Sequence, residues 1–130
     1  MRYALLVQGA PYSSQASHSA LRFAAALLAR GHNLECVFFY HDGVYNAARL
    51  AAPPQDEPHL MDAWCALNTE YGTRLQVCIA AALRRGLLDE REAARHGKSG
   101  YSVQSPFELT GLGQLIDAGL GCDRLVTFSP

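Results

Sequence analysis

Short apolar runs alternate with helix-forming segments along the chain, and this alternation restricts its fold more than any other feature of the sequence. The first run, Tyr3–Val7, is continuously apolar, which is typical of a strand covered on both faces. Similar runs recur at intervals that leave room for a helix between them. The predicted strands are Tyr3–Val7, Leu34–Tyr40, Arg74–Cys78, a minor strand at Phe107–Leu109, and Arg124–Phe128.

The segments between these runs have helical periodicity. In Ser17–Arg30, apolar residues recur every three or four positions, and Gly31 follows as a stop signal. Residues 51–58 are too rich in proline for a regular element and predict a surface loop. The other predicted helices are Val44–Leu50, His59–Tyr71, a helix from Cys78 towards Gly86, Asp89–Ala94 with Asp89 as N-cap, and Gly111–Ala118.

This order of elements predicts an α/β fold of three layers, α/β/α, with a mostly parallel sheet of four to five strands. A chain of 130 residues is long enough for one core, so we expect a single domain spanning residues 1–130. In such a sheet, the loops at the carboxyl ends of the strands gather along one edge, where sites are found. These loops carry Tyr12–Ser14 with His18 beyond, His41-Asp42, and Cys78.

The charge balance excludes some classes of partner. The formal net charge is −1 and no basic cluster stands out, so there is no electrostatic case for direct nucleic-acid binding. The apolar N-terminal run is too short for a membrane span and lacks a signal-peptide pattern. The expected location is therefore the cytoplasm. The four cysteines form no C-x-x-C pair, which in a reducing compartment disfavours structural disulfides and zinc; no metal and no cofactor are expected.

Cys78 is the candidate catalytic residue, because it lies where a buried strand is predicted to run into a helix. Free backbone N–H groups and the dipole at a helix start favour the thiolate, which is the reactive form of cysteine. Arg84 and Arg85 could add to the same field or face solvent. The alternative interpretation is that Cys78 is a small core residue, the common fate of an unpaired cysteine.

The sequence also contains features of three other chemistries. A hydrolytic Cys-His pair would need His41 or His18 next to Cys78. Ser13-Ser14 after the first strand could cradle the phosphate of a flavin, although the loop lacks a string of hydroxyl residues. Gly111-Leu112-Gly113 is only a fragment of a dinucleotide fingerprint, and its glycines instead favour close helix packing.

The remaining cysteines suit structural roles. Cys36 is predicted in mid-strand and Cys65 on a helix beside Trp64, so both are interpreted as packing residues. Cys122 precedes the last strand, at the opposite edge from Cys78 if that strand is parallel, so a disulfide between them would be out of reach. A single activated thiol suits one task in particular: accepting a sulfur atom as a persulfide and passing it on.

Several motifs in the same order resemble the TusD/DsrE subunits of the DsrE/DsrF-like family along nearly the whole chain. The matching segments are Val37–Tyr40, Asp42–Ala47, the V-C-x-A-A-A-x-R-R-G motif at Val77–Gly86, Leu109–Gly113 and Cys122–Val126. The resemblance implies a sulfurtransferase subunit of a sulfur relay. The motif cysteine, which carries the persulfide in this family, is matched here by Cys78.

The resemblance also implies partners. Members of this type work in a heterohexamer with TusB/TusC-like (DsrH/DsrF-like) subunits, take sulfur from a TusA-like donor and give it to a TusE/DsrC-like acceptor. The Tus branch leads to 2-thiouridine at the wobble position of tRNA, and the Dsr branch to dissimilatory sulfur oxidation. Val44–Ala47 is closer to the first branch, whereas His41 and residues 53–56 are closer to the second. We expect the tRNA branch because it is more widespread; a structural subunit with an inert Cys78 is the rival interpretation.

Overall fold

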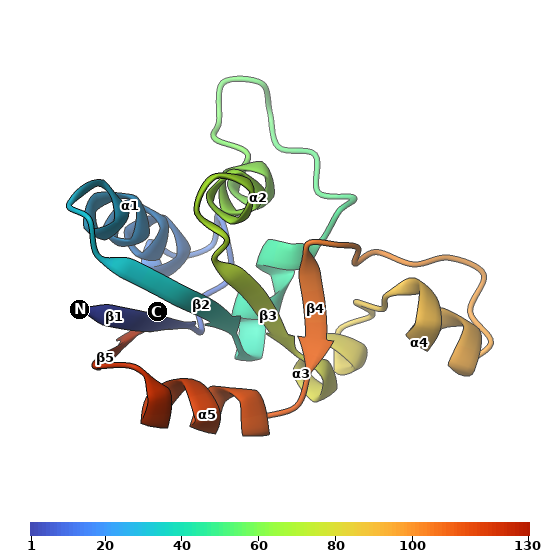
Figure 1. Ribbon diagram of the computed structural model, residues 1–130. Coiled ribbons are helices and arrows are strands. Elements are labelled where there is room, and N and C mark those ends of the chain that lie inside the picture. Colours follow the sequence, from blue (N-terminus) through green and yellow to red (C-terminus); the bar gives the residue numbers. More distant parts are fainter.

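A computed structural model describes all residues, 1–130, and its centre is a five-stranded sheet in the order β4-β3-β2-β1-β5 (Figure 1). Every pair of neighbouring strands is parallel. The strands are β1 Arg2–Val7, β2 Asn33–Phe39, β3 Arg74–Cys78, β4 Phe107–Thr110 and β5 Arg124–Phe128. The predicted minor strand is thus a full edge strand, and the predicted parallel sheet is confirmed.

Helices cover the two faces of the sheet unequally (Figure 1). Helices α1 (Ala16–Ala29) and α2 (Leu60–Tyr71) lie side by side on one face, and α5 (Gly113–Gly121) lies on the other. Two short helices, α3 (Ile79–Arg84) and α4 (Glu90–Arg95), lie towards the β4 end of the sheet. The predicted three-layer architecture is confirmed. None of the helices combines the length and the apolar character needed to span a membrane.

The main core lies between the sheet and the pair α1 and α2. Trp64 of α2 is fully buried, and its ring packs edge-on against Phe39 of β2, with 5.3 Å between ring centroids. Phe39 also packs against Phe107 of β4. Burying side chains of this size stabilises the fold by about 1.5–3 kcal/mol each, so this layer fixes the positions of the inner strands.

The caps predicted from sequence explain where the helices end. Gly72 ends α2 in the left-handed conformation, with φ of 75°, and Gly31 follows α1 with φ of 85°. Asp89 caps α4 as predicted, because its Oδ1 accepts a hydrogen bond of 2.8 Å from the backbone N–H of Glu92. These boundaries follow from local chemistry alone.

One predicted helix is displaced. The sequence predicts a helix over Val44–Leu50, whereas the structure forms a 3-10 helix, η1, over His41–Ala47, and Ala48 is already extended with ψ of 101°. The reason is tertiary: Gly43 packs so closely on β1 that a Cβ there would overlap the backbone oxygen of Val7. This contact starts the turn three residues earlier than the periodicity indicates.

The α5 face of the sheet is also more open than the apolar runs predict. The edge strand β5 exposes Leu125 and Thr127, and most of α5 is exposed. On β3 and β4, the residues on this face are polar and include Arg74, Gln76 and Glu108. The expectation of a buried strand is confirmed for β3, which is buried from Leu75 to Cys78 even though Gln76 is polar, whereas the edge strands β4 and β5 are only partly buried.

Candidate functional site

Cys78 is the last residue of β3 and the N-cap residue of α3, so the predicted strand-to-helix junction is confirmed. Its backbone is extended, with φ of −61° and ψ of 116°. The residue is 2% exposed, and no hydrogen bond involves its Sγ. The helix that follows has six residues, so its dipole is small compared with that of a longer helix. Another molecule therefore reaches this sulfur only if the surface above it opens.

The carboxyl ends of the strands bring two of the predicted segments together. Arg85 Nε of α3 lies 2.9 Å from Asp42 Oδ1 of η1, and Arg85 Nη1 donates a 3.0 Å bond to the Ala81 carbonyl. Arg84 is exposed and makes no ion pair or hydrogen bond. Of the two arginines, Arg85 therefore shapes this edge, through the loop after β2.

The histidines do not form a catalytic pair with Cys78. His41 is exposed and stacks on Tyr40, with 4.0 Å between ring centroids. His18 packs edge-on against Tyr12. Because neither ring hydrogen-bonds the thiol, the geometry gives no support to a hydrolytic Cys-His dyad.

The flavin and dinucleotide alternatives gain no support either. The cavity that Ser14 and His18 line holds about 180 Å³, below the roughly 300–1,000 Å³ of typical small-molecule sites. A Cβ added at Gly111 or Gly113 would meet nothing within 4 Å. The expectation that these glycines allow close helix packing was therefore wrong; they join β4 to α5 across open space.

Burial disfavours the thiolate form of the other three cysteines. Burial raises the pKa of Cys36 to about 11, against the weaker opposing effect of nearby Arg74. Burial is also the main cause that raises the pKa of Cys65 and of Cys122. These thiols stay protonated near pH 7, and Cys36 is fully buried as predicted.

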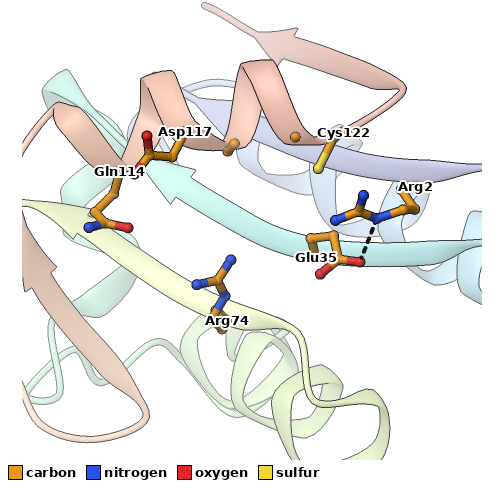
Figure 2. Close-up of a pocket in the computed structure, with 8 residues that line it drawn as sticks. Arg2, Glu35, Arg74, Gln114, Asp117 and Cys122 are labelled. Atoms are coloured by element: carbon orange, nitrogen blue, oxygen red, sulfur yellow. Dashed lines mark hydrogen bonds and ion pairs between the residues drawn. The ribbon is translucent and has the colours of Figure 1, made fainter.

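A cavity of about 170 Å³ surrounds Cys122 at the amino ends of the strands (Figure 2). Its walls carry charges of both signs, including the ion pair of 3.1 Å between Arg2 Nε and Glu35 Oε1. Arg74 and Gln114 point into it from β3 and α5. Because the strands are parallel, this cavity at their amino ends and Cys78 at the carboxyl end of β3 lie on opposite edges of the sheet. All four cysteines are free.

Two polar residues beside Cys78 were not predicted from the sequence. Gln76 lies two residues before Cys78 on β3, and Thr110 of β4 is paired with Cys78 across the sheet. The sequence did contain one indication: polar Gln76 alternates with apolar Leu75 and Val77, which is typical of a strand whose two faces differ in polarity. Pairing with β4 could not be seen before the fold was known.

The fold and the site define a class of protein: a parallel α/β domain with a single free thiol at the carboxyl end of an inner strand. The sequence model of the DsrE/DsrF-like family matches residues 1–128. The chain therefore belongs to the DsrE/DsrF-like family.

Relatives of similar length lie close in sequence. Sulfurtransferase TusD of Salmonella newport (strain SL254) is 54% identical over 128 residues, which are 98% of this chain and 100% of that protein. DsrE of Allochromatium vinosum is 48% identical over 128 residues, 98% of each chain. These similarities support a sulfurtransferase enzyme. The crystal structure of the YchN protein from E. coli shares the fold, with a TM-score of 0.79 at 23% identity over 98% of this chain and 99% of that one.

Proposed function

We propose that this chain carries sulfur as a persulfide on Cys78 within a sulfur relay. The observation that carries the proposal is the position of Cys78, a free cysteine at the carboxyl end of β3 and the edge where parallel α/β sheets place their sites. The relatives named sulfurtransferase, which match nearly the whole chain, support the same reaction class. The raised pKa values of Cys36, Cys65 and Cys122 disfavour the reactive thiolate form at those three positions.

The chemistry needs only thiols. The Cys78 thiolate attacks the outer sulfur of a donor persulfide, the donor's S–S bond breaks, and the donor leaves as a thiolate. Cys78 now carries the S–S⁻ group. An acceptor thiolate then attacks that outer sulfur, and Cys78 is released as a thiolate. Each step forms one S–S bond and breaks one, so no external oxidant or reductant is consumed.

The donor we propose is a TusA-like protein and the acceptor a TusE/DsrC-like protein, acting in the cytoplasm, where thiols remain reduced. The primary proposal is the tRNA branch, which ends in 2-thiouridine. Supporting it, identity to TusD of Salmonella newport is 54%, against 48% to DsrE of Allochromatium vinosum. The second of these relatives also supports the alternative, a subunit of dissimilatory sulfur oxidation. Tests of sulfur delivery to a TusE-like and to a DsrC-like acceptor would distinguish the branches.

We further propose assembly with TusB/TusC-like (DsrH/DsrF-like) subunits in a heterohexamer. An apolar stripe on the outer side of α5 supports it: Leu112, Ile116 and Leu120 recur every four residues and are 44%, 62% and 84% exposed. Leu125 of β5 is also 41% exposed. Exposed apolar groups aligned on one helix are typical of protein interfaces.

The direct test is intact-mass spectrometry after incubation with a persulfidated TusA-like donor. The wild-type chain should gain the mass of one sulfur atom, removable by reductant, and Cys78→Ser should not. Cys65→Ser is the matched control and should still gain it, because Cys65 lies on α2 and away from the relay edge. Equal gain by wild type and Cys78→Ser would overturn the assignment, as would no gain by either.

A further inference from the structure

Cys78 shares its face of the sheet with two polar side chains. Gln76 and Cys78 are two residues apart on β3, so their side chains emerge on the same face, with their Cα atoms about 6.6 Å apart. Thr110 is the β4 partner of Cys78, across a strand spacing of about 4.8 Å. This is the face of the sheet on which α5 lies, and Cys78 is at the same time part of the buried apolar core (Figure 1). The register therefore places an amide and a hydroxyl beside the thiol.

Both neighbours carry a buried oxygen without a hydrogen-bond partner: Gln76 Oε1 and Thr110 Oγ1. Gln76 is 3% exposed and Cys78 2%. Only one other buried side-chain atom lacks a partner, Glu92 Oε2, and it lies on α4 at 3.4 Å from His96 Nε2. The two unpaired neutral groups thus both flank the same sulfur.

Apart from Glu92 Oε2, the buried polar side chains elsewhere in this fold are paired. Asn46 donates to Ser17 Oγ at 3.0 Å and accepts from Trp64 Nε1 at 3.1 Å. Thr73 donates to the Leu34 carbonyl at 3.0 Å. Buried polar groups are nearly always paired, and an exception calls for an explanation such as a missing ligand. Unpaired oxygens on both sides of Cys78 therefore indicate a place for an additional group.

We infer that Gln76 and Thr110 are positioning residues that hold the anionic sulfur of Cys78, first as the thiolate and then as the persulfide. The persulfide part rests on the proposed function; the thiolate part does not. The Thr110 hydroxyl can rotate to donate to the sulfur. The Gln76 amide can turn about its last bond, so that Nε2–H donates to the anion and Oε1 accepts from a protonated S–H. The terminal sulfur is the added group that completes both hydrogen bonds.

This arrangement gives the buried thiol a way to ionise. Burial alone disfavours a thiolate, and hydrogen bonds to the charged form oppose that effect. After sulfur transfer, the outer sulfur would lie beside the same amide and hydroxyl groups, which are shielded from water and from unrelated thiols. Gln76 and Thr110 form no bond to the transferred atom, so their contribution is to stabilise and orient it.

The first test is the thiolate absorbance of Cys78 against pH, obtained by subtracting the same titration of a variant that also carries Cys78→Ser. Thr110→Val and Gln76→Met keep the shape of each side chain and remove the donor, so the midpoint of thiolate formation should rise by about one pH unit. Thr110→Ser, which keeps the hydroxyl, should retain the wild-type midpoint. Thr127→Val on exposed β5 is the control and should leave the midpoint unchanged.

The titration needs no sulfur donor, so it tests the thiolate part of the inference even if the chain accepts no sulfur. Unchanged midpoints in Thr110→Val and Gln76→Met would overturn the inference. An equal rise in Thr110→Ser and Thr110→Val would also overturn it, because packing and not the hydroxyl would then be responsible. Circular dichroism verifies folding, and Gln76→Asn replaces Gln76→Met if the latter fails to fold; its shortened amide should also raise the midpoint.

The second test follows the persulfide itself. The chain is loaded with inorganic polysulfide, and the fraction of Cys78 that retains the extra sulfur is followed by mass spectrometry. Thr110→Val should lose the sulfur several times faster than wild type, and Thr110→Ser at the wild-type rate. Equal lifetimes in all three would overturn the persulfide part, whereas failure of wild type to load from a protein donor counts against the proposed function alone.

Discussion

Arg85 Nε lies 2.9 Å from Asp42 Oδ1, and this ion pair joins the helix that follows Cys78 to the turn that follows β2. The Arg85 side chain is 24% exposed and the Asp42 side chain 59% exposed. Solvent therefore screens the pair, and its contribution to stability is modest. Its importance is positional: it fixes α3 against η1, next to the thiol.

Replacing Arg85 tests that connection. Arg85→Ala should lower the free energy of unfolding by about 1 kcal/mol, because it removes the ion pair and the bond to the Ala81 carbonyl. Arg84→Ala is the matched control on the same helix and should change it by less than about 0.5 kcal/mol, since Arg84 has no partner. Urea unfolding measures both. Equal effects would show that the pair does not hold the helix.

Gly43 should not tolerate a side chain. Gly43→Ala places a Cβ against the backbone oxygen of Val7, so the free energy of unfolding should fall by about 3 kcal/mol or more. Gly119→Ala is the contrasting variant, because its Cβ would only touch Leu125 at 3.8 Å and alanine favours a helix. That change should stabilise the chain by about 0.5–1 kcal/mol. Thermal or urea unfolding compares the two variants. A small effect of Gly43→Ala would contradict the explanation that the close contact of Gly43 with Val7 sets the position of the turn.

The buried amide of Asn46 joins α1, η1 and α2. Asn46→Ala removes the hydrogen-bond partners of Trp64 Nε1, Ser17 Oγ and the Gly43 carbonyl. The free energy of unfolding should therefore fall by about 2–4 kcal/mol. Asn68→Ala, which loses one partly buried bond to the Thr73 carbonyl, should cost about 1 kcal/mol. Trp64 is the only tryptophan, so its fluorescence can be used to follow unfolding and reports the loss of its hydrogen bond to Asn46. A cost no greater than that of Asn68→Ala would argue against the network.

The buried thiol of Cys36 should make stability depend on alkaline pH. Its pKa is raised from 9.0 to about 11, so between these values the unfolded chain loses a proton that the folded chain keeps. The free energy of unfolding should then fall as pH rises above 9, by up to about 2 kcal/mol. Cys36→Ala should be less stable near neutral pH but should lack this part of the decline. Urea unfolding of the wild-type chain and of Cys36→Ala from pH 8 to 11 tests this prediction. If the free energy of unfolding falls equally with pH in both chains, the decline does not come from Cys36.

Assembly should depend on the apolar stripe of α5. Ile116→Glu or Leu120→Glu places a charge in the proposed interface and should abolish co-purification with TusB/TusC-like subunits. Gln114→Glu is the control, because Gln114 lies on the side of α5 that faces the Arg74 cavity. Native mass spectrometry of the co-expressed subunits gives the composition. Intact complexes with Ile116→Glu and with Leu120→Glu would show that the partners bind elsewhere.

The sequence by itself determined the order of strands and helices and the place of Cys78 at a strand end. These properties depend on local chemistry: apolar runs define strands, and glycines such as Gly72 and the Asp89 cap define helix ends. Parallel strand pairing then follows from the helical crossovers. The sequence motif around Cys78 also indicated the family to which the chain belongs.

Only the tertiary structure decided what surrounds the thiol. Thr110 meets Cys78 because β4 pairs with β3 in one particular register, and Asp42 meets Arg85 because η1 turns three residues early on Gly43. The 2% exposure of Cys78 has the same origin, since burial is the sum of contacts between segments distant in the chain. Such contacts leave no periodic signal in sequence, because each depends on where the other segment is placed in space.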